Sequence, residues 1–288
     1  MHMPSVGSPP SYAPVAIFVG GTSGIGQVMA EAFARYTKGN AHIVIVGRNR
    51  AFAESIIENL PKPTVPNVTH EFVQCEATLM RNVHATTTEL LSRVPKINFL
   101  IMSPGALSTR GRDETEEGID KQLAVHYYAR WMFTNGLMPA LLEAKNAGED
   151  VKVFSVLAAG EGREELDGPG PEKKFIFKNA GLTAITYDDL LVEVTVFIVE
   201  KTSLNLFPHQ KFATQNPGIA FTHAHQGLVR TSMLGSSDSE SSVVRAVSSL
   251  LYFEHMLFDL LDGERMRSGG DPKAGEKLWE DTVESNKV

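Results

Sequence analysis

Cysteine is nearly absent from this chain of 288 residues, since Cys75 is the only one. A single thiol forms no internal disulfide and no thiolate metal cluster. The nine histidines show no metal-ligand spacing beyond His223-x-His225, which is weak on a strand, so we expect no metal site. Positive charge is also scarce, with 27 Lys and Arg against 34 Asp and Glu and a net charge of −7. This balance argues against nucleic acid or an anionic membrane surface as a partner.

Long hydrophobic runs are missing too. No apolar run reaches the length that spans a bilayer, and no basic segment followed by an apolar stretch marks a secretory signal. We therefore expect a cytoplasmic protein that acts on a small molecule. The length suits one large α/β domain. Residues 1–13, with several prolines, are expected to be a loose N-terminal tail, and 14–288 a single domain.

The most informative pattern is an apolar, β-branched run over 15–19 that ends in glycines spaced G-x3-G-x-G, at Gly20, Gly24 and Gly26. A helix-like stretch through Ala34 follows, which predicts a strand, a tight turn and a helix N-terminus. Glycines let the backbone approach a pyrophosphate, and the first amides and dipole of the helix hold its negative charge. The turn therefore predicts a nucleotide cofactor.

Short apolar strands alternate with helical stretches along the chain, which is typical of a parallel sheet covered on both faces. We expect a Rossmann-type, doubly wound α/β fold with three α/β/α layers. The expected strands are 15–20, 41–47, 70–75, 97–103, 151–157 and 218–223. The expected helices are 24–36, 51–59, 80–93, 115–143, part of 176–215, and 241–262. The apolar stretch 243–261 is interpreted as core, with a substrate lid or a homo-oligomer face as alternatives.

Residues 194–210 do not match the helix expected around them, because their β-branched residues suit a strand and Pro208 breaks a helix. Without this segment, its flanks join into an amphipathic helix that runs into a strand. The segment begins with Val and ends with Gln, whose codons can carry the borders of an intron. Two interpretations stay open: an in-frame retained intron, or a genuine insertion that forms an extra strand or surface loop.

These landmarks, in this order, resemble the short-chain dehydrogenase/reductase family over roughly residues 13–193 and 211–232. In dinucleotide-binding folds, an acid at the end of the second strand accepts from the ribose 2′-hydroxyl of NAD. Here Gly47 ends that strand and Arg48 follows, which favours the 2′-phosphate of NADP(H). The alternative is that Arg48 and Arg50 are solvated turn charges.

The resemblance also implies which residues contact the cofactor. Glu76 and Ala77 match the turn beside the adenine, Ser103 and Gly105 lie where the family has Asn-Asn-Ala-Gly, and Thr231 would touch the nicotinamide carboxamide. The expected cofactor-binding residues are Gly20, Thr22, Ser23, Gly24, Ile25, Gly26, Arg48, Asn49, Glu76, Ala77, Ser103, Gly105 and Thr231.

The catalytic residues that the family implies are missing. It uses a Tyr as acid/base, a Lys that lowers the pKa of that Tyr, a Ser and an Asn. The matching positions hold Phe175, Asn179, Leu157 and His126, and no Tyr-x-x-x-Lys occurs anywhere in the chain. A phenyl ring has no proton to give, so the usual mechanism does not apply to this sequence.

Three residues are candidate substitutes. His126 could donate a proton near neutral pH, and Ser155 lies two residues before the expected Ser position, facing either the cleft or the core. Arg130 lies one turn after His126, either to bind an anionic substrate or as a solvated charge. We weigh an NADP(H)-dependent oxidoreductase of a small organic carbonyl or alcohol, with a non-standard proton donor, against three alternatives. These are a non-redox isomerase or cyclase, a catalytically inactive cofactor-binding protein, and a non-functional gene product.

Overall fold

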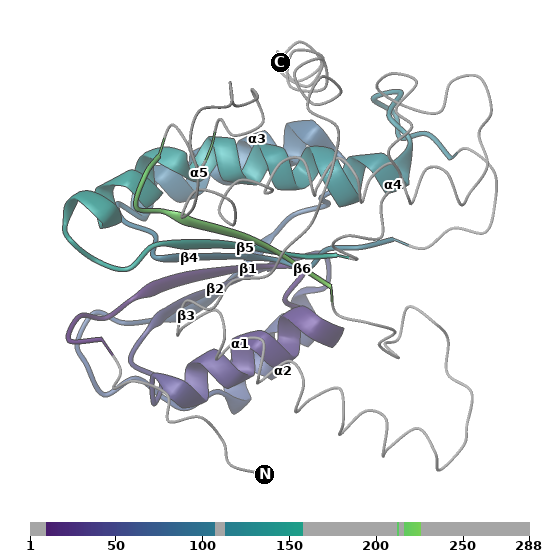
Figure 1. Cartoon of the computed structure of the whole chain (residues 1–288). Coiled ribbons are helices and arrows are strands. Elements are labelled where there is room, and N and C mark those ends of the chain that lie inside the picture. Colours follow the sequence, from purple (N-terminus) through teal and green to yellow (C-terminus); the bar gives the residue numbers. More distant parts are fainter. Residues whose placement is uncertain (1–9, 107–112, 158–211, 213–215, 226–288) are drawn as a thin grey trace.

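A six-stranded parallel sheet forms the centre of the protein (Figure 1). The computed structural model describes residues 10–106, 113–157, 212 and 216–225. The strands are β1 (Val15–Val19), β2 (His42–Gly47), β3 (His70–Gln74), β4 (Phe99–Met102), β5 (Lys152–Leu157) and β6 (Ala220–His225). Their order, β3-β2-β1-β4-β5-β6, is that of a doubly wound dinucleotide-binding sheet. The predicted fold class is confirmed.

Helices cover both faces of this sheet (Figure 1). One face carries α1 (Gly24–Tyr36) and α2 (Arg50–Asn59), and the other carries α3 (Met80–Arg93) and α5 (Ala129–Asn146). The short α4 (Lys121–Leu123) and the π-helical turn η1 (Ala124–Tyr128) lead into α5. Within the described part of the chain, each helix is too short or too polar to cross a bilayer.

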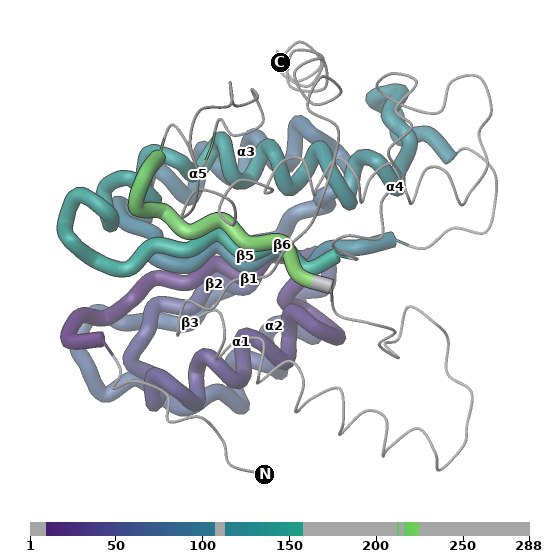
Figure 2. Tube along the Cα trace, in the orientation of Figure 1, coloured from purple at the N-terminus to yellow at the C-terminus, as the bar shows by residue number. Residues whose placement is uncertain are grey.

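The core consists of two apolar layers, because side chains of a strand alternate between the faces of a sheet. Ile17 and Val19 of β1 pack in the layer under α3 and α5, whereas Phe18 packs in the layer under α1 and α2. Figure 2 shows β5 and β6 side by side at the edge opposite β3. The inner strands β1, β2 and β4 are buried on both sides, which explains why they appear in the sequence as continuous apolar runs. The edge strand β3 is only partly buried.

The helix predicted over 115–143 is wrong at its start. Residues 114 and 120 form an isolated antiparallel bridge, and helical structure begins only at Lys121. Asp120 sets this start, because its Oδ1 accepts hydrogen bonds from the backbone N–H groups of Gln122 (3.0 Å) and Leu123 (3.3 Å). The helix then continues to Asn146, beyond the predicted end.

Several expectations lie outside the described residues. They are the loose tail over 1–9, the helices within 176–215 (apart from residue 212) and over 241–262, the insertion 194–210, Phe175, Asn179 and Thr231.

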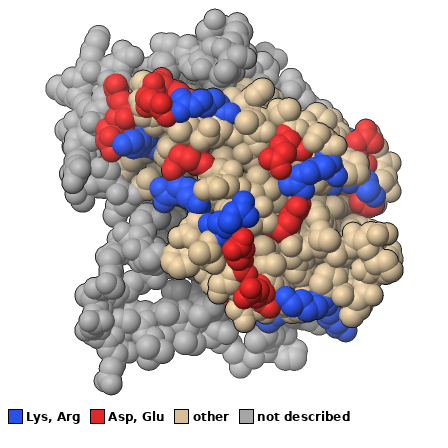
Figure 3. Space-filling view, turned by 180° about the vertical axis from the view of Figure 1, so that it is seen from behind, with Lys and Arg blue, Asp and Glu red and all other residues tan. Residues whose placement is uncertain are grey.

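Charges of both signs are interspersed on the face of the described residues in Figure 3. Several charged residues of the described part of the chain pair: Arg93 contacts Glu71 (2.6 Å) and Glu89 (3.3 Å), and Arg50 contacts Glu54 (3.5 Å). Exposed pairs of this kind contribute little to stability. On this face the described residues form no stripe of a single charge.

Candidate functional site

The glycine-rich turn joins β1 to α1 at the carboxyl edge of the sheet. Gly20 has φ +83°, a backbone conformation that favours glycine, and a Cβ there would lie 2.7 Å from the backbone nitrogen of Pro104. A Cβ on Gly26 would lie 2.5 Å from both the carbonyl oxygen of Gly20 and Oγ of Ser103. These close approaches explain the glycine spacing: the turn packs backbone against backbone between β1 and β4.

A cavity of about 150 Å³ opens directly above this turn. Its walls come from the carboxyl ends of β1, β2, β3 and β4 and from the start of α1, which is where doubly wound sheets bind ligands. Ten predicted cofactor residues line it: Gly20, Thr22, Ser23, Gly24, Ile25, Arg48, Glu76, Ala77, Ser103 and Gly105. The structure therefore brings together residues that lie as far apart as 20 and 105 in the chain.

Two further predicted cofactor residues do not line the cavity. Gly26 lies in the first turn of α1, packed against Gly20 and Ser103. Asn49 is the N-cap of α2, and its Oδ1 accepts from the backbone N–H of Phe52 at 3.1 Å. Its side chain is therefore engaged with the helix, which fixes where the chain turns after Arg48.

The end of β2 has no room for an acidic side chain in the present packing. A Cβ on Gly47 would lie 2.6 Å from Cγ2 of Thr22, so any side chain at this position requires Thr22 to move. Arg48 follows, with 72% of its side chain exposed and Nη1 3.6 Å from Oε2 of Glu76. A glycine therefore stands where an NAD-preferring site has an acid, and a cation follows it.

The helix before α5 contains a π-helical turn over Ala124–Tyr128, and His126 lies within it. Such turns widen a helix by one residue and occur frequently at functional sites. Nε2 of His126 accepts a hydrogen bond from the backbone N–H of Ala106 at 3.1 Å. Because that nitrogen accepts, the ring hydrogen is on Nδ1. Val125, next to His126, lines the cavity, so this turn forms part of its floor.

Burial, together with the neighbouring charge of Arg130, lowers the pKa of His126 to about 3. The ring is therefore neutral near pH 7, and Nε2 carries no proton to give. This geometry supports a positioning role, in which His126 holds the segment after β4, rather than proton donation.

Arg130 lies wholly inside the protein, with none of its surface exposed, which corrects its interpretation as a solvated charge. Its guanidinium donates to Oγ of Ser155 (3.1 Å) and to the carbonyl oxygens of His126 (3.1 Å), Pro104 (2.9 Å) and Val156 (3.0 Å). It therefore ties β5 and the segment after β4 to α5. A buried guanidinium held in this way does not reach a substrate anion in the cavity.

Ser155 is buried as well, with 1% of its surface exposed. Its Oγ accepts from Nε of Arg130, so the hydroxyl points into the interface between β5 and α5 rather than into the cleft. His223 of β6 lies beside it in the sheet register and is also buried. Leu157, at the expected Ser position, is the last residue of β5.

Sequence reasoning missed the structural role of Arg130, although one signal was available. Arg130 is the only Lys, Arg, Asp or Glu between Lys121 and Glu143. A charged residue within a long, otherwise uncharged helix has few solvated neighbours, and buried charges need hydrogen-bond partners. The pattern therefore indicates a buried, bonded arginine rather than a solvated one.

Comparisons with known proteins agree with this architecture. The model of the short chain dehydrogenase family matches residues 14–164. Oxidoreductase AN1596 of Emericella nidulans is 33% identical over 222 residues, which cover 77% of this chain and 60% of that protein. Oxidoreductase andH of Emericella variicolor is 32% identical, over 76% of this chain and 59% of that protein. The chain thus spans about 60% of the length of these curated relatives.

Solved structures share the fold at low sequence identity. An alcohol dehydrogenase from the archaeon Thermococcus sibiricus, complexed with 5-hydroxy-NADP, superposes with a TM-score of 0.59 at 14% identity, over 91% of this chain and 97% of that chain. RhlG of Pseudomonas aeruginosa, in an active-site complex with NADP, superposes with a TM-score of 0.59 at 13% identity, over 92% of this chain and 96% of that chain.

Proposed function

Because this chain belongs to the short-chain dehydrogenase family, we propose that its cavity binds NADP(H) and that the protein is an oxidoreductase of a small organic carbonyl or alcohol. The bound cofactor would supply the hydride, and the protein would supply binding and orientation. We further propose that residues 14–288 form one domain that works in the cytoplasm. The two relatives AN1596 and andH are both named as oxidoreductases, which supports the reaction class.

The observation that carries the cofactor proposal is the end of β2. Thr22 fills the space beside Gly47, and Arg48 extends along the cavity rim. A guanidinium offers paired N–H donors that match a phosphate, whereas the ribose hydroxyl of NAD gains nothing from a cation. The glycine turn also supports a pyrophosphate site: Gly20 takes a φ of +83° that favours glycine, and the turn leads directly into the N-terminus of α1, whose first amides can hold negative charge.

A second function, a non-redox isomerase or cyclase or a cofactor-binding protein without catalysis, is favoured by the floor of the cavity. The described lining residues that follow β4 or belong to η1 are Ser103, Pro104, Gly105, Ala106 and Val125, and none of them has a side chain that titrates near neutral pH. His126, just beneath, is neutral and accepts rather than donates at Nε2.

A fluorescence titration with NADPH and, separately, NADH tests the cofactor proposal. We expect micromolar affinity for NADPH and clearly weaker binding of NADH. Arg48→Gln should weaken the binding of NADPH but not that of NADH. Arg50→Gln is the matched control and should leave both affinities unchanged, because Arg50 also follows β2 but does not line the cavity. Failure of the folded protein to bind either nucleotide would overturn the proposal.

Catalysis is then tested by incubating the protein with NADPH and a panel of aldehydes and ketones. Formation of alcohol in step with NADPH consumption supports the oxidoreductase. Conversion of a substrate with no net change in NADPH would instead identify the non-redox function.

A further inference from the structure

The cavity has one cationic and one anionic side chain among the described residues that line it, Arg48 and Glu76. Their charged groups face one another across the gap between the ends of β2 and β3, with Nη1 and Oε2 3.6 Å apart. The charges of the described side chains that line this cavity therefore sum to zero. A dinucleotide with a 2′-phosphate brings several negative charges into this space. The position of the Glu76 carboxylate therefore affects how strongly such a dinucleotide binds.

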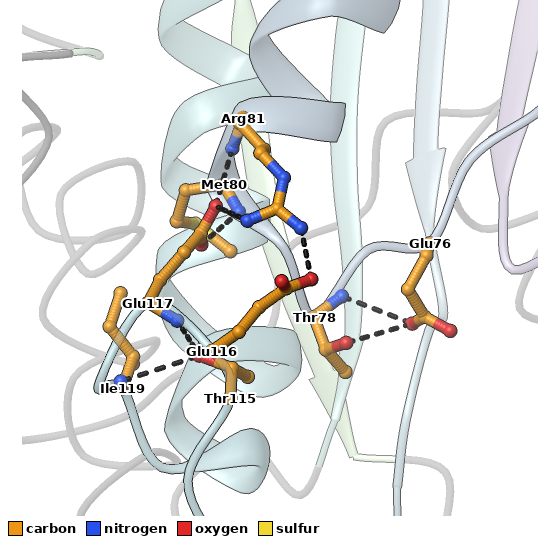
Figure 4. A network of polar contacts seen from close by, with 8 residues as sticks. All are labelled: Glu76, Thr78, Met80, Arg81, Thr115, Glu116, Glu117 and Ile119. Carbon is orange, nitrogen blue, oxygen red and sulfur yellow. Dashed lines mark hydrogen bonds and ion pairs between the residues drawn. The ribbon is translucent and has the colours of Figure 1, made fainter.

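Glu76 is held in place, whereas Arg48 is not. Oε1 of Glu76 accepts from the backbone N–H (3.3 Å) and the Oγ1 hydroxyl (2.9 Å) of Thr78, which Figure 4 shows as two bonds converging on one oxygen. Oε2 is left to face Arg48. The Arg48 side chain is 72% exposed against 35% for Glu76, so the guanidinium is the partner with room to move.

The backbone fixes the two residues opposite each other. The N–H of Cys75 donates to the carbonyl oxygen of Gly47 at 2.8 Å, which keeps β2 and β3 paired up to their ends. Nε2 of Gln74 donates to the carbonyl oxygen of Arg48 at 3.3 Å. The relative position of Arg48 and Glu76 is therefore built into the sheet.

We propose that Glu76 is a specificity-determining residue, whose fixed carboxylate competes with the 2′-phosphate of NADP(H) for the guanidinium of Arg48. This inference rests on the proposed binding of NADP(H) in this cavity. To bind the phosphate, Arg48 must leave or share its contact with Glu76, and the carboxylate also repels the incoming dianion. NAD(H) has no such phosphate and leaves the ion pair intact. Glu76 thus reduces the preference for NADP(H) that Arg48 creates.

The test is a titration of Glu76→Gln with NADPH and NADH. Glutamine keeps the size of the side chain and an oxygen for Thr78 but removes the charge. We expect NADPH to bind about two- to fivefold more tightly, the range that exposed charge pairs produce, and NADH to change less. The gain should shrink as salt rises from about 0.05 M to about 0.5 M, because the pair is screened.

A double-mutant cycle with Arg48→Gln identifies the cause. If the competition is correct, the gain from Glu76→Gln falls to the small part due to direct repulsion when Arg48 is absent. Glu54→Gln is the matched control, since Glu54 pairs with Arg50 on α2 away from the cavity and should leave both affinities unchanged.

The outcomes separate the two proposals. Wild-type preference for NADPH together with unchanged or weaker NADPH binding by Glu76→Gln would overturn the competition and leave the cofactor assignment intact. Absence of nucleotide binding by the folded wild-type protein would overturn the assignment itself, and the inference with it.

Discussion

The buried Arg130 offers the sharpest test of how this site is held together. We consider Arg130→Met, which keeps an unbranched side chain of similar length and removes every donor. Four acceptors then lose the hydrogen bond that Arg130 donates: Oγ of Ser155 and the carbonyl oxygens of His126, Pro104 and Val156.

Hydrogen bonds to a charged group contribute about 1.5–3 kcal/mol each, so four would contribute about 6–12 kcal/mol. The variant regains several kcal/mol, because a guanidinium no longer has to be desolvated. We therefore expect a net loss of about 3–5 kcal/mol in the free energy of unfolding, the upper end of what single substitutions cost.

Urea unfolding followed by tryptophan fluorescence measures this loss. At an m-value of about 2–3 kcal/mol/M, the midpoint should fall by about 1–2.5 M. Arg50→Met is the control, because Arg50 is exposed and its helical pair with Glu54 contributes only about 0.3–0.5 kcal/mol. A midpoint for Arg130→Met no lower than that of the control would refute the argument that these four bonds hold β5 and the segment after β4 to α5.

Three other features give separate tests. Gly26→Ala should abolish nucleotide binding, measured by NADPH titration, because its Cβ would lie 2.5 Å from the carbonyl oxygen of Gly20 and from Oγ of Ser103. Gly148 does not line the cavity and a Cβ there meets no atom within 4 Å, so Gly148→Ala should lower stability, because its φ is +75°, but bind NADPH normally. His126 has a pKa of about 3 in the folded protein, below its unfolded value, so its contribution to stability is complete above about pH 6.5 and is lost as pH falls. From pH 7 to pH 5, the free energy of unfolding measured in urea should fall by about 2 kcal/mol more for the wild type than for His126→Asn. Equal decreases for the two proteins would contradict this. Glu117 accepts from two backbone N–H groups at the start of α3 (Figure 4). Glu117→Gln should therefore lower the thermal midpoint more than Glu116→Gln, by an amount that corresponds to about 1 kcal/mol in the free energy of unfolding. Equal midpoints of the two variants would contradict a capping role for Glu117.

The sheet and the turn above it could be predicted from the sequence because their signals are local. The inner strands β1, β2 and β4 are short apolar runs buried on both faces, and the turn after 15–19 needs glycines within a few residues of each other. The turn residues Thr22, Ser23 and Gly24 line the cavity for the same reason, because position along a tight turn fixes position in space.

The start of the helix after 113 could not be predicted from apolar periodicity, because a side chain decides it. Asp120 caps the helix directly after residues that fold back on themselves, where the N–H of Thr115 donates to the carbonyl oxygen of Ile119. Glu117, from the same segment, accepts from the N–H of Met80, 37 residues earlier. Such contacts depend on the fold as a whole and leave no periodic signal in the sequence.

The hydrogen bond of His126 also depends on the fold as a whole, and it decides which chemistry this residue can perform. In the sequence, a histidine at the position of a catalytic Asn is a candidate proton donor. In the fold, Nε2 accepts from Ala106, 20 residues earlier, so a proton on that nitrogen would break the bond that holds the floor of the cavity. Donation from Nε2 and positioning are therefore mutually exclusive, and the low pKa of His126 selects positioning at neutral pH. If the protein reduces a carbonyl, we expect the proton to come from a group other than Nε2 of His126.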